Sequence, residues 1–275
     1  MSALVSAAEL ITELSSGRPP RLLDVRYQLL KPDGRDDYRA GHIPGAVYVP
    51  LEEELSSHGD PADGRHPQPS QETLQNAARR WGLNDGDRVV VYDGGSTLAS
   101  GRTWWTLRGA GVDIRVLDGG LPAWIAAGGE LATDDVVPAP GTITLGTLPA
   151  GIDIGTAASW PVDGVLVDVR AAERFRGDVE PMDPIAGHIP GAVNLPSATY
   201  FREDGTFRSP AEIAAAFDSV GATADVKVAT YCGSGITAAQ AALAAEVAGR
   251  SVAVFLGSWS AWSNTPGLPV ATGDA

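Results

Sequence analysis

The sequence predicts an α/β protein built from two tandem copies of one domain, each a small parallel sheet with helices on both faces. Its 275 residues are enough for about two domains of ordinary size. The octapeptide at Ala40–Val47 recurs unchanged at Ala186–Val193. Three further pairs of similar segments keep the same order along the chain: Leu23–Arg26 with Val167–Arg170, Val89–Asp93 with Val228–Cys232, and Leu117–Trp124 with Leu256–Trp262. Self-similarity that keeps its order indicates duplication of a whole domain.

Each copy alternates short apolar runs with helical stretches. In the first copy the runs are rich in Val, Leu, Ile and Tyr and end at Gly, Asp or Pro, which predicts buried strands. These strands are expected at 22–25, 47–49, 88–92 and 114–117. Ser6 and Glu9 form a capping-box pattern that predicts a helix over Ala7–Leu14, and Ser70 begins a second helix that runs through Trp81.

The two copies are expected to be contiguous domains joined by a linker. We assign residues 1–135 to the N-terminal domain, 136–150 to the linker and 151–275 to the C-terminal domain. The stretch 133–150 contains three prolines and shows no helical periodicity, which is typical of a connecting segment.

Charge and composition exclude several classes of protein. Hydrophobic residues make up 44% and charged residues 20% of the chain, so a disordered or collagen-like protein is excluded. The 34 acidic and 20 basic residues give a net charge of -14, which repels nucleic acid and anionic membranes. The N-terminus lacks a basic signal region, and no apolar run is long enough to span a membrane. We therefore expect that the protein binds neither nucleic acid nor a membrane. We also expect a cytoplasmic location.

The chain has one cysteine, Cys232, so no disulfide can form within it. The four histidines have no zinc-ligand spacing with this cysteine, and we expect no metal and no cofactor. Cys232 stands between a predicted strand at Val226–Tyr231 and an Ala-rich helix predicted at Ala238–Ala248. A strand, a cysteine and a helix in this order favour a site at the strand end.

The turn Cys232–Thr237 has the composition of an anion-binding loop. Glycines at 233 and 235 allow successive backbone N–H groups to point inward, and the following helix adds its positive N-terminal end. Such an environment stabilises a thiolate. The alternative is a small buried core cysteine, but the copy has Asp93 at the same place, and a core position rarely accepts a carboxylate.

At these residues the chain resembles the rhodanese, or sulfurtransferase, family, and the resemblance covers almost its whole length. In that family an N-terminal domain without the cysteine accompanies a C-terminal domain that keeps it, as Asp93 and Cys232 do here. The loop Cys-Gly-Ser-Gly-Ile-Thr is similar to the Cys-Gly-Ser-Gly-Val-Thr loop of 3-mercaptopyruvate sulfurtransferases. Thiosulfate-preferring members typically carry basic residues after the cysteine, whereas this loop offers only neutral groups.

The resemblance implies sulfur transfer through a covalent intermediate. The Cys232 thiolate would attack the sulfane sulfur of 3-mercaptopyruvate and form a persulfide, with Ser234 polarising the donor. Because the chain has no second cysteine, the acceptor must be external: cyanide, a small thiol or thioredoxin. The alternative donor is thiosulfate, with the same acceptors.

The resemblance also implies which residues bind the anionic donor. Arg174 matches the family's substrate-binding arginine, whose guanidinium can hold a carboxylate at two points; the alternative is a surface arginine. A second arginine is expected in a Glu-Pro-Arg stretch, but Met182 stands there, so Arg176 is the candidate to replace it. The expected donor-binding set is Arg174, Arg176, Gly233, Gly235, Ile236 and Thr237.

Two histidines lie in the repeated Gly-His-Ile-Pro-Gly turn. The turn occurs in both copies, including the one without a thiol, so His188 is expected to be structural. For His42 two roles stay open: the same structural role, or a proton relay with Ser234 that the resemblance implies. The acids considered for this relay are Asp33, Asp36 and Asp37.

Two other functional classes fit the sequence less well than sulfur transfer. Cysteine phosphatases need an arginine six residues after the cysteine to hold the phosphoryl oxygens, and that position is Ala238. A binding module without catalytic activity fits the N-terminal copy alone, because only that copy lacks the cysteine.

Overall fold

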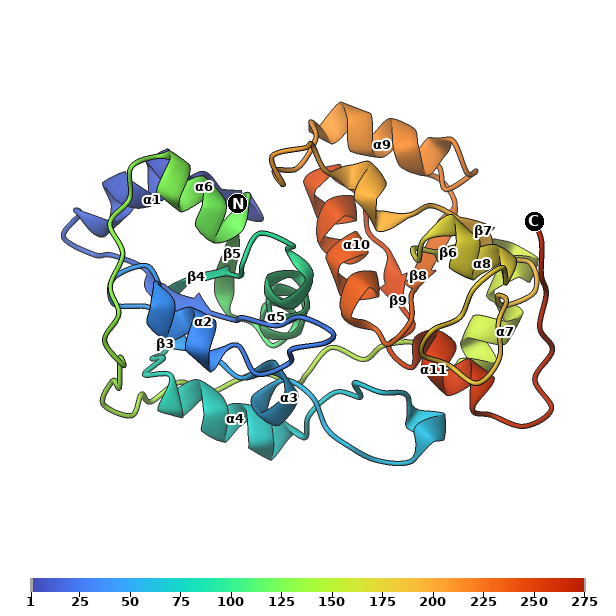
Figure 1. Ribbon diagram of the computed structural model, residues 1–275, viewed down its shortest axis with the longest axis horizontal. Helices are drawn as coiled ribbons and strands as arrows, with labels where there is room; N and C mark the ends of the chain where they lie inside the picture. The colour runs from blue at the N-terminus through green and yellow to red at the C-terminus, as the bar shows by residue number, and fades with distance from the viewer. Residues whose placement is uncertain (1, 275) are drawn as a thin grey trace. The chain divides into compact units, whose positions relative to one another are not determined.

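The computed structural model describes residues 2–274, which fold into two compact units (Figure 1). The main chain passes from unit 1 to unit 2 at Pro149–Ala150. Two short segments depart from the contiguous division expected from the sequence: His58–Pro67 belongs to unit 2, and Arg202–Phe207 belongs to unit 1. Contacts with residues far away in the sequence hold each segment, which the repeat does not indicate.

Unit 1 is built on a five-stranded parallel sheet with the order β1-β5-β4-β2-β3. Its strands are β1 (Leu4–Val5), β2 (Arg21–Asp24), β3 (Val47–Tyr48), β4 (Arg88–Tyr92) and β5 (Asp113–Leu117). Its helices are α1 (Ala7–Leu14), α2 (Arg35–Ala40), α3 (Leu51–Glu54), α4 (Gln71–Arg80), α5 (Leu98–Gly109) and α6 (Gly120–Ala126). The four strands expected from the sequence are present, and β1 is an edge strand that was not predicted.

The predicted helix starts in unit 1 are confirmed. The Ser6 hydroxyl accepts a hydrogen bond from the Glu9 backbone N–H, and the Glu9 carboxylate accepts one from the Ser6 backbone N–H. This capping box satisfies donors that the first turn of α1 leaves free. Ser70 caps α4 in the same way through the Thr73 backbone N–H.

Helices cover both faces of the sheet in unit 1. Val90 and Tyr92 of β4 share a core with Leu10 of α1 and Trp124 of α6. The intervening residues of β4 point to the opposite face and are also buried, and α5 packs against β4 and β5.

Unit 2 repeats this plan with a four-stranded parallel sheet in the order β7-β6-β8-β9. Its strands are β6 (Gly164–Asp168), β7 (Val193–Asn194), β8 (Lys227–Tyr231) and β9 (Ala253–Val254). Its helices are α7 (Ile154–Asp163), α8 (Ala172–Arg176), α9 (Pro210–Asp218), α10 (Ile236–Val247) and α11 (Ser258–Ser263), with 3-10 turns η1 (Pro61–Asp63) and η2 (Ser197–Tyr200). The predicted fold class is confirmed.

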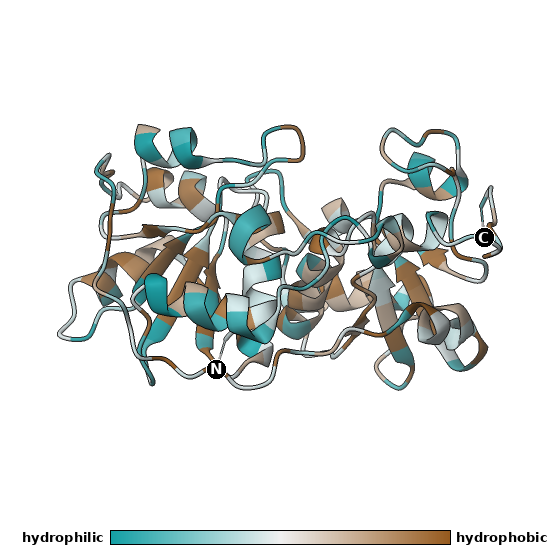
Figure 2. Cartoon of the chain, turned by 90° about the horizontal axis from the view of Figure 1, so that it is seen from below, coloured by the Kyte–Doolittle hydropathy of each residue, from teal (hydrophilic) through white to brown (hydrophobic). Residues whose placement is uncertain are grey.

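The apolar residues gather on the strands of each unit and on the helix faces against them (Figure 2). In unit 2, Tyr231 of β8 packs with Phe175, Trp259 and Trp262, all of which are buried. β4 and β8 each lie between two other strands, so their carboxyl ends open at the centre of a sheet edge. Ligand crevices of parallel sheets form at such edges.

Residues 133–149, which precede the connection between the two units, form no helix or strand, but backbone hydrogen bonds hold them against unit 1. The Gly141 N–H donates to the Arg79 carbonyl and the Ile143 N–H to the Leu83 carbonyl, so the stretch lies along α4 and the loop after it. A Cβ at Gly141 would clash with the Leu83 backbone, which explains the glycine there. Among residues 2–274, no helix is both long and apolar enough to cross a membrane.

Candidate active site around Cys232

Cys232 follows β8 directly, in a loop that leads into α10. Its side chain is buried, with 2% of the residue exposed. The Gly235 backbone N–H donates to the Cys232 Sγ over 3.1 Å. The sulfur therefore faces a backbone donor at the N-terminal end of a twelve-residue helix, where negative charge is stabilised.

Gly235 is the residue that allows this turn. Its φ is +84°, a conformation that favours glycine, and a Cβ there would lie 2.4 Å from the Leu256 carbonyl oxygen. α10 begins at Ile236, two residues earlier than the predicted Ala238. Ile236 and Thr237 therefore stand in the first turn of the helix, while Ser234 lies buried in the loop.

Ser258 is a site residue that the sequence analysis missed. Its hydroxyl accepts a hydrogen bond from the Cys232 backbone N–H over 3.1 Å and lies 3.8 Å from the Cys232 Sγ. Its φ is +54°, which strains a residue with a side chain. The equivalent residue in unit 1 is Gly120, with φ +58°, because the Leu121 N–H donates to the Asp93 carbonyl as the Trp259 N–H donates to the Cys232 carbonyl. The sequence alone could have indicated this role, because unit 2 has a serine at a position where unit 1 has a glycine.

The corresponding loop of unit 1 holds an anion of its own. Asp93 follows β4 as Cys232 follows β8, and its carboxylate accepts hydrogen bonds from the backbone N–H groups of Gly95, Thr97 and Ser100. The Ser100 hydroxyl adds a fourth bond. This backbone arrangement is therefore suited to holding negative charge, and in unit 1 the carboxylate of Asp93 fills it.

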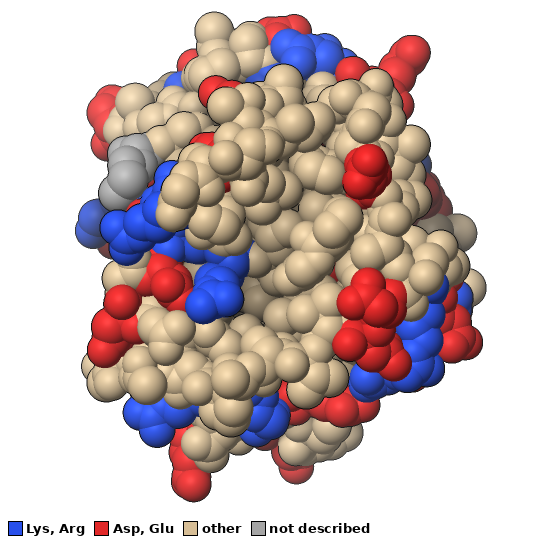
Figure 3. Space-filling model, turned by 90° about the vertical axis from the view of Figure 1, so that its left-hand side faces the viewer, with Lys and Arg blue, Asp and Glu red and all other residues tan. Residues whose placement is uncertain are grey.

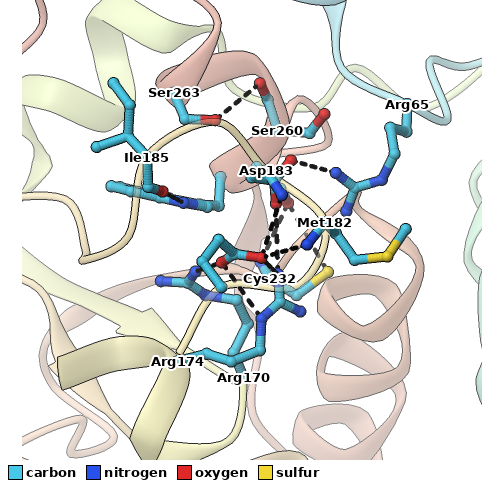
Figure 4. A network of polar contacts seen from close by, with 12 residues as sticks. Arg65, Arg170, Arg174, Met182, Asp183, Ile185, Cys232, Ser260 and Ser263 are labelled. Atoms are coloured by element: carbon cyan, nitrogen blue, oxygen red, sulfur yellow. Dashed lines mark hydrogen bonds and ion pairs between the residues drawn. The ribbon is translucent and has the colours of Figure 1, made fainter. Parts of the chain in front are cut away.

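A network of alternating charges lies next to the cysteine loop (Figure 4). Arg170 pairs with Asp168 at 2.6 Å and with Glu180 at 3.3 Å. Arg174 of α8 pairs with Glu180 at 2.6 Å and with Asp183 at 3.3 Å. The structure thus brings the predicted Arg174 to the loop, but with carboxylates of the protein already on it.

Arg65 is the second missed residue, and it comes from the segment His58–Pro67 of unit 2. Its guanidinium pairs with Asp183. Its Nη2 lies 3.1 Å from the position that a Cβ on Gly233 would occupy, and the Arg174 Nη1 lies 3.4 Å from the same position. Burial raises the pKa of the Asp183 carboxyl, although Arg65 beside it acts in the opposite direction.

The loop was expected to offer only neutral groups to a donor, and Arg65 adds a charged group beside it that was not predicted. The residues of the loop are neutral, but two guanidinium groups lie beside Gly233. No pattern in the sequence indicates Arg65, because it stands far from Cys232 along the chain. Its position depends on the path of a surface segment.

Neither Met182 nor Arg176 supplies a second guanidinium group next to Arg174. Met182 is partly exposed, and its backbone N–H donates to the Glu180 carboxylate. The Arg176 guanidinium pairs with Asp178 at 2.7 Å, and Arg176 lines a hollow of about 330 Å³ with Asp274. Its described contacts are therefore outside the network that joins Arg174 to Asp183.

The two repeated histidines have matching environments. The His42 Nδ1 lies 2.9 Å from the Tyr38 carbonyl oxygen, and its ring stacks on Tyr38. The His188 Nδ1 lies 2.8 Å from the Phe175 carbonyl oxygen, and its ring stacks on Phe175. The match favours a structural role for both rings, while the proton relay of His42 stays a prediction.

The acid beside His42 differs from those considered. The Asp134 Oδ1 lies 4.0 Å from the His42 Nε2. Asp33 instead accepts a hydrogen bond from the Tyr48 hydroxyl, and Asp37 pairs with Lys31 at 2.7 Å. Asp134 lies after α6, at the start of the proline-containing stretch 133–150 that the sequence predicts to be a connecting segment.

A hollow of about 630 Å³ in unit 1 is lined by none of the predicted site residues. Its walls include Ile11, Leu14, Trp81, Trp124 and Pro138. Figure 3 shows the left-hand side of Figure 1, where α1 and α6 lie, as a largely uncharged and hollowed surface with charged groups around it. Within residues 2–274, no group of three or more His, Cys, Asp or Glu side chains is placed to hold a metal ion.

Comparisons with known proteins agree on one family. The family model for the rhodanese-like domain matches residues 6–127 and 156–265. SseB of Mycobacterium tuberculosis, provisionally named a thiosulfate sulfurtransferase, is 46% identical over 277 aligned positions, which cover 99% of this chain and 98% of that protein. Human 3-mercaptopyruvate sulfurtransferase is 34% identical over 94% of this chain and 91% of its own length. The solved structure of SseA from Escherichia coli, titled a 3-mercaptopyruvate sulfotransferase, matches with a TM-score of 0.83 and 31% identity over 94% of this chain and 99% of that one.

Proposed function

This chain belongs to the rhodanese family and is a sulfurtransferase, and we propose that it moves sulfur from 3-mercaptopyruvate to a thiol or cyanide through a persulfide on Cys232. The thiolate attacks the donor sulfur, and the carbon–sulfur bond breaks. Its electron pair leaves with the enolate of pyruvate, which takes up a proton. The acceptor then attacks the outer sulfur, and the sulfur–sulfur bond returns its electron pair to Cys232.

The observation that carries this proposal is the environment of the sulfur. The Gly235 N–H donates to the Cys232 Sγ, and the matching loop of unit 1 holds the Asp93 carboxylate with backbone N–H groups. A persulfide is an anion one atom longer than a thiolate, and the loop can hold it with the same kind of donors. Acceptors in this proposal are external: cyanide, a small thiol or thioredoxin.

Arg174 is the residue that orients the donor carboxylate in this proposal. Arg174→Ala is expected to raise the KM for 3-mercaptopyruvate about 30-fold, which corresponds to ~2 kcal/mol for a lost charge-assisted contact. The loss is moderate because Glu180 and Asp183 already share this guanidinium. Steady-state kinetics measures the change. Arg208→Ala, which removes an exposed arginine paired with Glu212, is the matched control, and an unchanged KM in Arg174→Ala would remove Arg174 from the donor site.

Thiosulfate is the second candidate donor, and one observation favours it. Two guanidinium groups lie beside Gly233, and a compact dianion gains more from them than a monoanion does. The relative SseB carries the name of a thiosulfate sulfurtransferase. Three carboxylates of the network oppose this gain, because Asp168, Glu180 and Asp183 neutralise the arginines.

The experiment that tests the choice of donor is a comparison of both on one preparation with cyanide as the acceptor. We expect a higher kcat/KM with 3-mercaptopyruvate than with thiosulfate, because its single carboxylate suits a network that is close to neutral. A kcat/KM with thiosulfate that equals or exceeds the other would assign the chain to thiosulfate. Pyruvate and sulfite are the respective products, so each donor has its own readout.

A further inference from the structure

We propose that Arg65 is a second donor-binding residue, and that it forms with Arg174 an anion clamp above Gly233 in which the Asp183 carboxylate is the resident counter-ion. This inference rests on the proposed function, because it assigns the clamp to the anionic group of the sulfur donor. It adds to the site a residue from the first half of the chain, in a protein where Met182 stands in place of the second arginine that the family resemblance implies.

The two guanidinium groups converge on one point of the loop. The Arg65 Nη2 and the Arg174 Nη1 lie 3.1 Å and 3.4 Å from the place that a Cβ on Gly233 would take. Gly233 follows Cys232 directly, so a donor whose sulfur meets the Cys232 Sγ has its anionic group within reach of this point. A side chain at 233 would crowd the Arg65 guanidinium and contact that of Arg174, so a glycine leaves this space open.

Arg65 has hydrogen-bond donors left for a ligand. Its Nη1 is the atom that pairs with Asp183, whereas its Nη2 faces Gly233. An arginine whose guanidinium is only partly used can bind a carboxylate or sulfonate oxygen without first giving up its own partner.

The segment that carries Arg65 is fixed to unit 2 by close backbone contact. A Cβ on Gly64 would lie 2.7 Å from the Gly257 carbonyl oxygen, at the N-terminal side of α11, and η1 packs on α11. η1 lies within the long loop that joins α3 to α4, which Figure 1 shows in light blue to cyan. Packing therefore helps to fix the segment that carries Arg65, in addition to the ion pair with Asp183.

Asp183 completes the clamp. Its side chain is 1% exposed and contacts Arg65 and Arg174 together (Figure 4). A carboxylate shared by two arginines mimics the anionic group of a donor. Because it is attached to the protein, it holds both guanidinium groups in place before a donor anion binds. Removing its charge takes the carboxylate partner from Arg65 and leaves Arg174 with Glu180 alone, so the attraction for a donor anion should increase. This gives the inference a second test, in which the expected change has the opposite sign.

The rate of alkylation of Cys232 measures this clamp without any sulfur transfer. Iodoacetate is an anion and iodoacetamide is its neutral analogue, and the chain has only one thiol to modify. The ratio of their second-order rate constants reports the anion attraction at Cys232. Arg65→Gln should lower this ratio about fivefold, as expected for one charge removed at close range. Asp183→Asn should raise it, and the exposed control Arg208→Gln should leave it unchanged.

Arg65→Lys separates a charge effect from a structural effect. Lysine keeps the charge, so this variant should stay within twofold of the wild-type ratio while Arg65→Gln falls. An equal loss in both variants would mean that the arginine only holds its segment, and this would overturn the proposal. The proposal would also be overturned if the ratio of alkylation rate constants were unchanged in Arg65→Gln but lower in Arg174→Gln.

The donor kinetics then link the clamp to the reaction. Arg65→Gln should raise the KM for the donor severalfold and leave kcat within about twofold, as expected for lost binding of an anion. If neither donor loads Cys232 in the wild type, the proposed function fails while the alkylation ratio still tests the clamp. If loading occurs but the KM is unchanged in Arg65→Gln, the clamp fails and the proposed function stands.

Discussion

Replacement of Cys232 by serine is expected to lower sulfur transfer by about three orders of magnitude or more with either donor, because a serine hydroxyl does not act as the sulfur nucleophile. Cys232 is the only thiol of the chain, so no neighbouring residue can take over. The measurement is the rate of thiocyanate formation with cyanide as acceptor.

The fold should tolerate this substitution. The side chain is small and buried, and the Gly235 N–H that donates to the sulfur can donate to a hydroxyl oxygen instead. Circular dichroism and the melting temperature are the controls. Retained sulfur transfer in a folded Cys232→Ser protein would show that Cys232 is not the nucleophile and would contradict the proposed mechanism.

Gly235→Ala is expected to cause the second-largest loss, in both stability and activity. The added Cβ would lie 2.4 Å from the Leu256 carbonyl oxygen at a φ of +84°, so the turn must shift. We expect a cost of about 2–3 kcal/mol in the free energy of unfolding from strain and overpacking. We also expect about a 100-fold lower kcat, because the N–H that faces the sulfur moves with the turn.

Gly249→Ala is the matched control for this prediction. Gly249 has φ +70° and no atom within 4 Å of its added Cβ, so it shares the backbone conformation without the crowding. It should lose about 1 kcal/mol from the unfavourable φ alone, and its kcat should not change. If both variants kept the wild-type kcat, the Gly235 N–H would have no part in the reaction.

Much of the fold followed from local patterns. The capping residues Ser6 and Ser70 predicted where α1 and α4 begin, because a cap is a contact within one turn. The duplicated octapeptide predicted two sheets of one plan, and the Asp93 and Cys232 pair predicted two equivalent loops. The start of α10 was placed two residues late, because Ile236 and Thr237 were read as part of the turn.

The predicted site was complete only where its residues are neighbours in sequence. Cys232, Gly233, Ser234 and Gly235 belong to one loop, and Arg174 was found through the family resemblance. The position of Arg65 depends on the path of the segment His58–Pro67, which local sequence patterns do not predict. Ser258 could have been predicted, because it replaces a glycine of the N-terminal copy. Its strained φ and its hydrogen bond from the Cys232 N–H are visible only in the structure.

The most direct test of the central claim is the mass of the protein after brief treatment with 3-mercaptopyruvate in the absence of any acceptor. The persulfide mechanism predicts one added sulfur atom, located on the peptide that contains Cys232 and removed again by cyanide. It also predicts no added sulfur in Cys232→Ser. Sulfur transfer to cyanide with no detectable sulfur on the Cys232 peptide, under conditions in which the donor is in excess, would contradict the account.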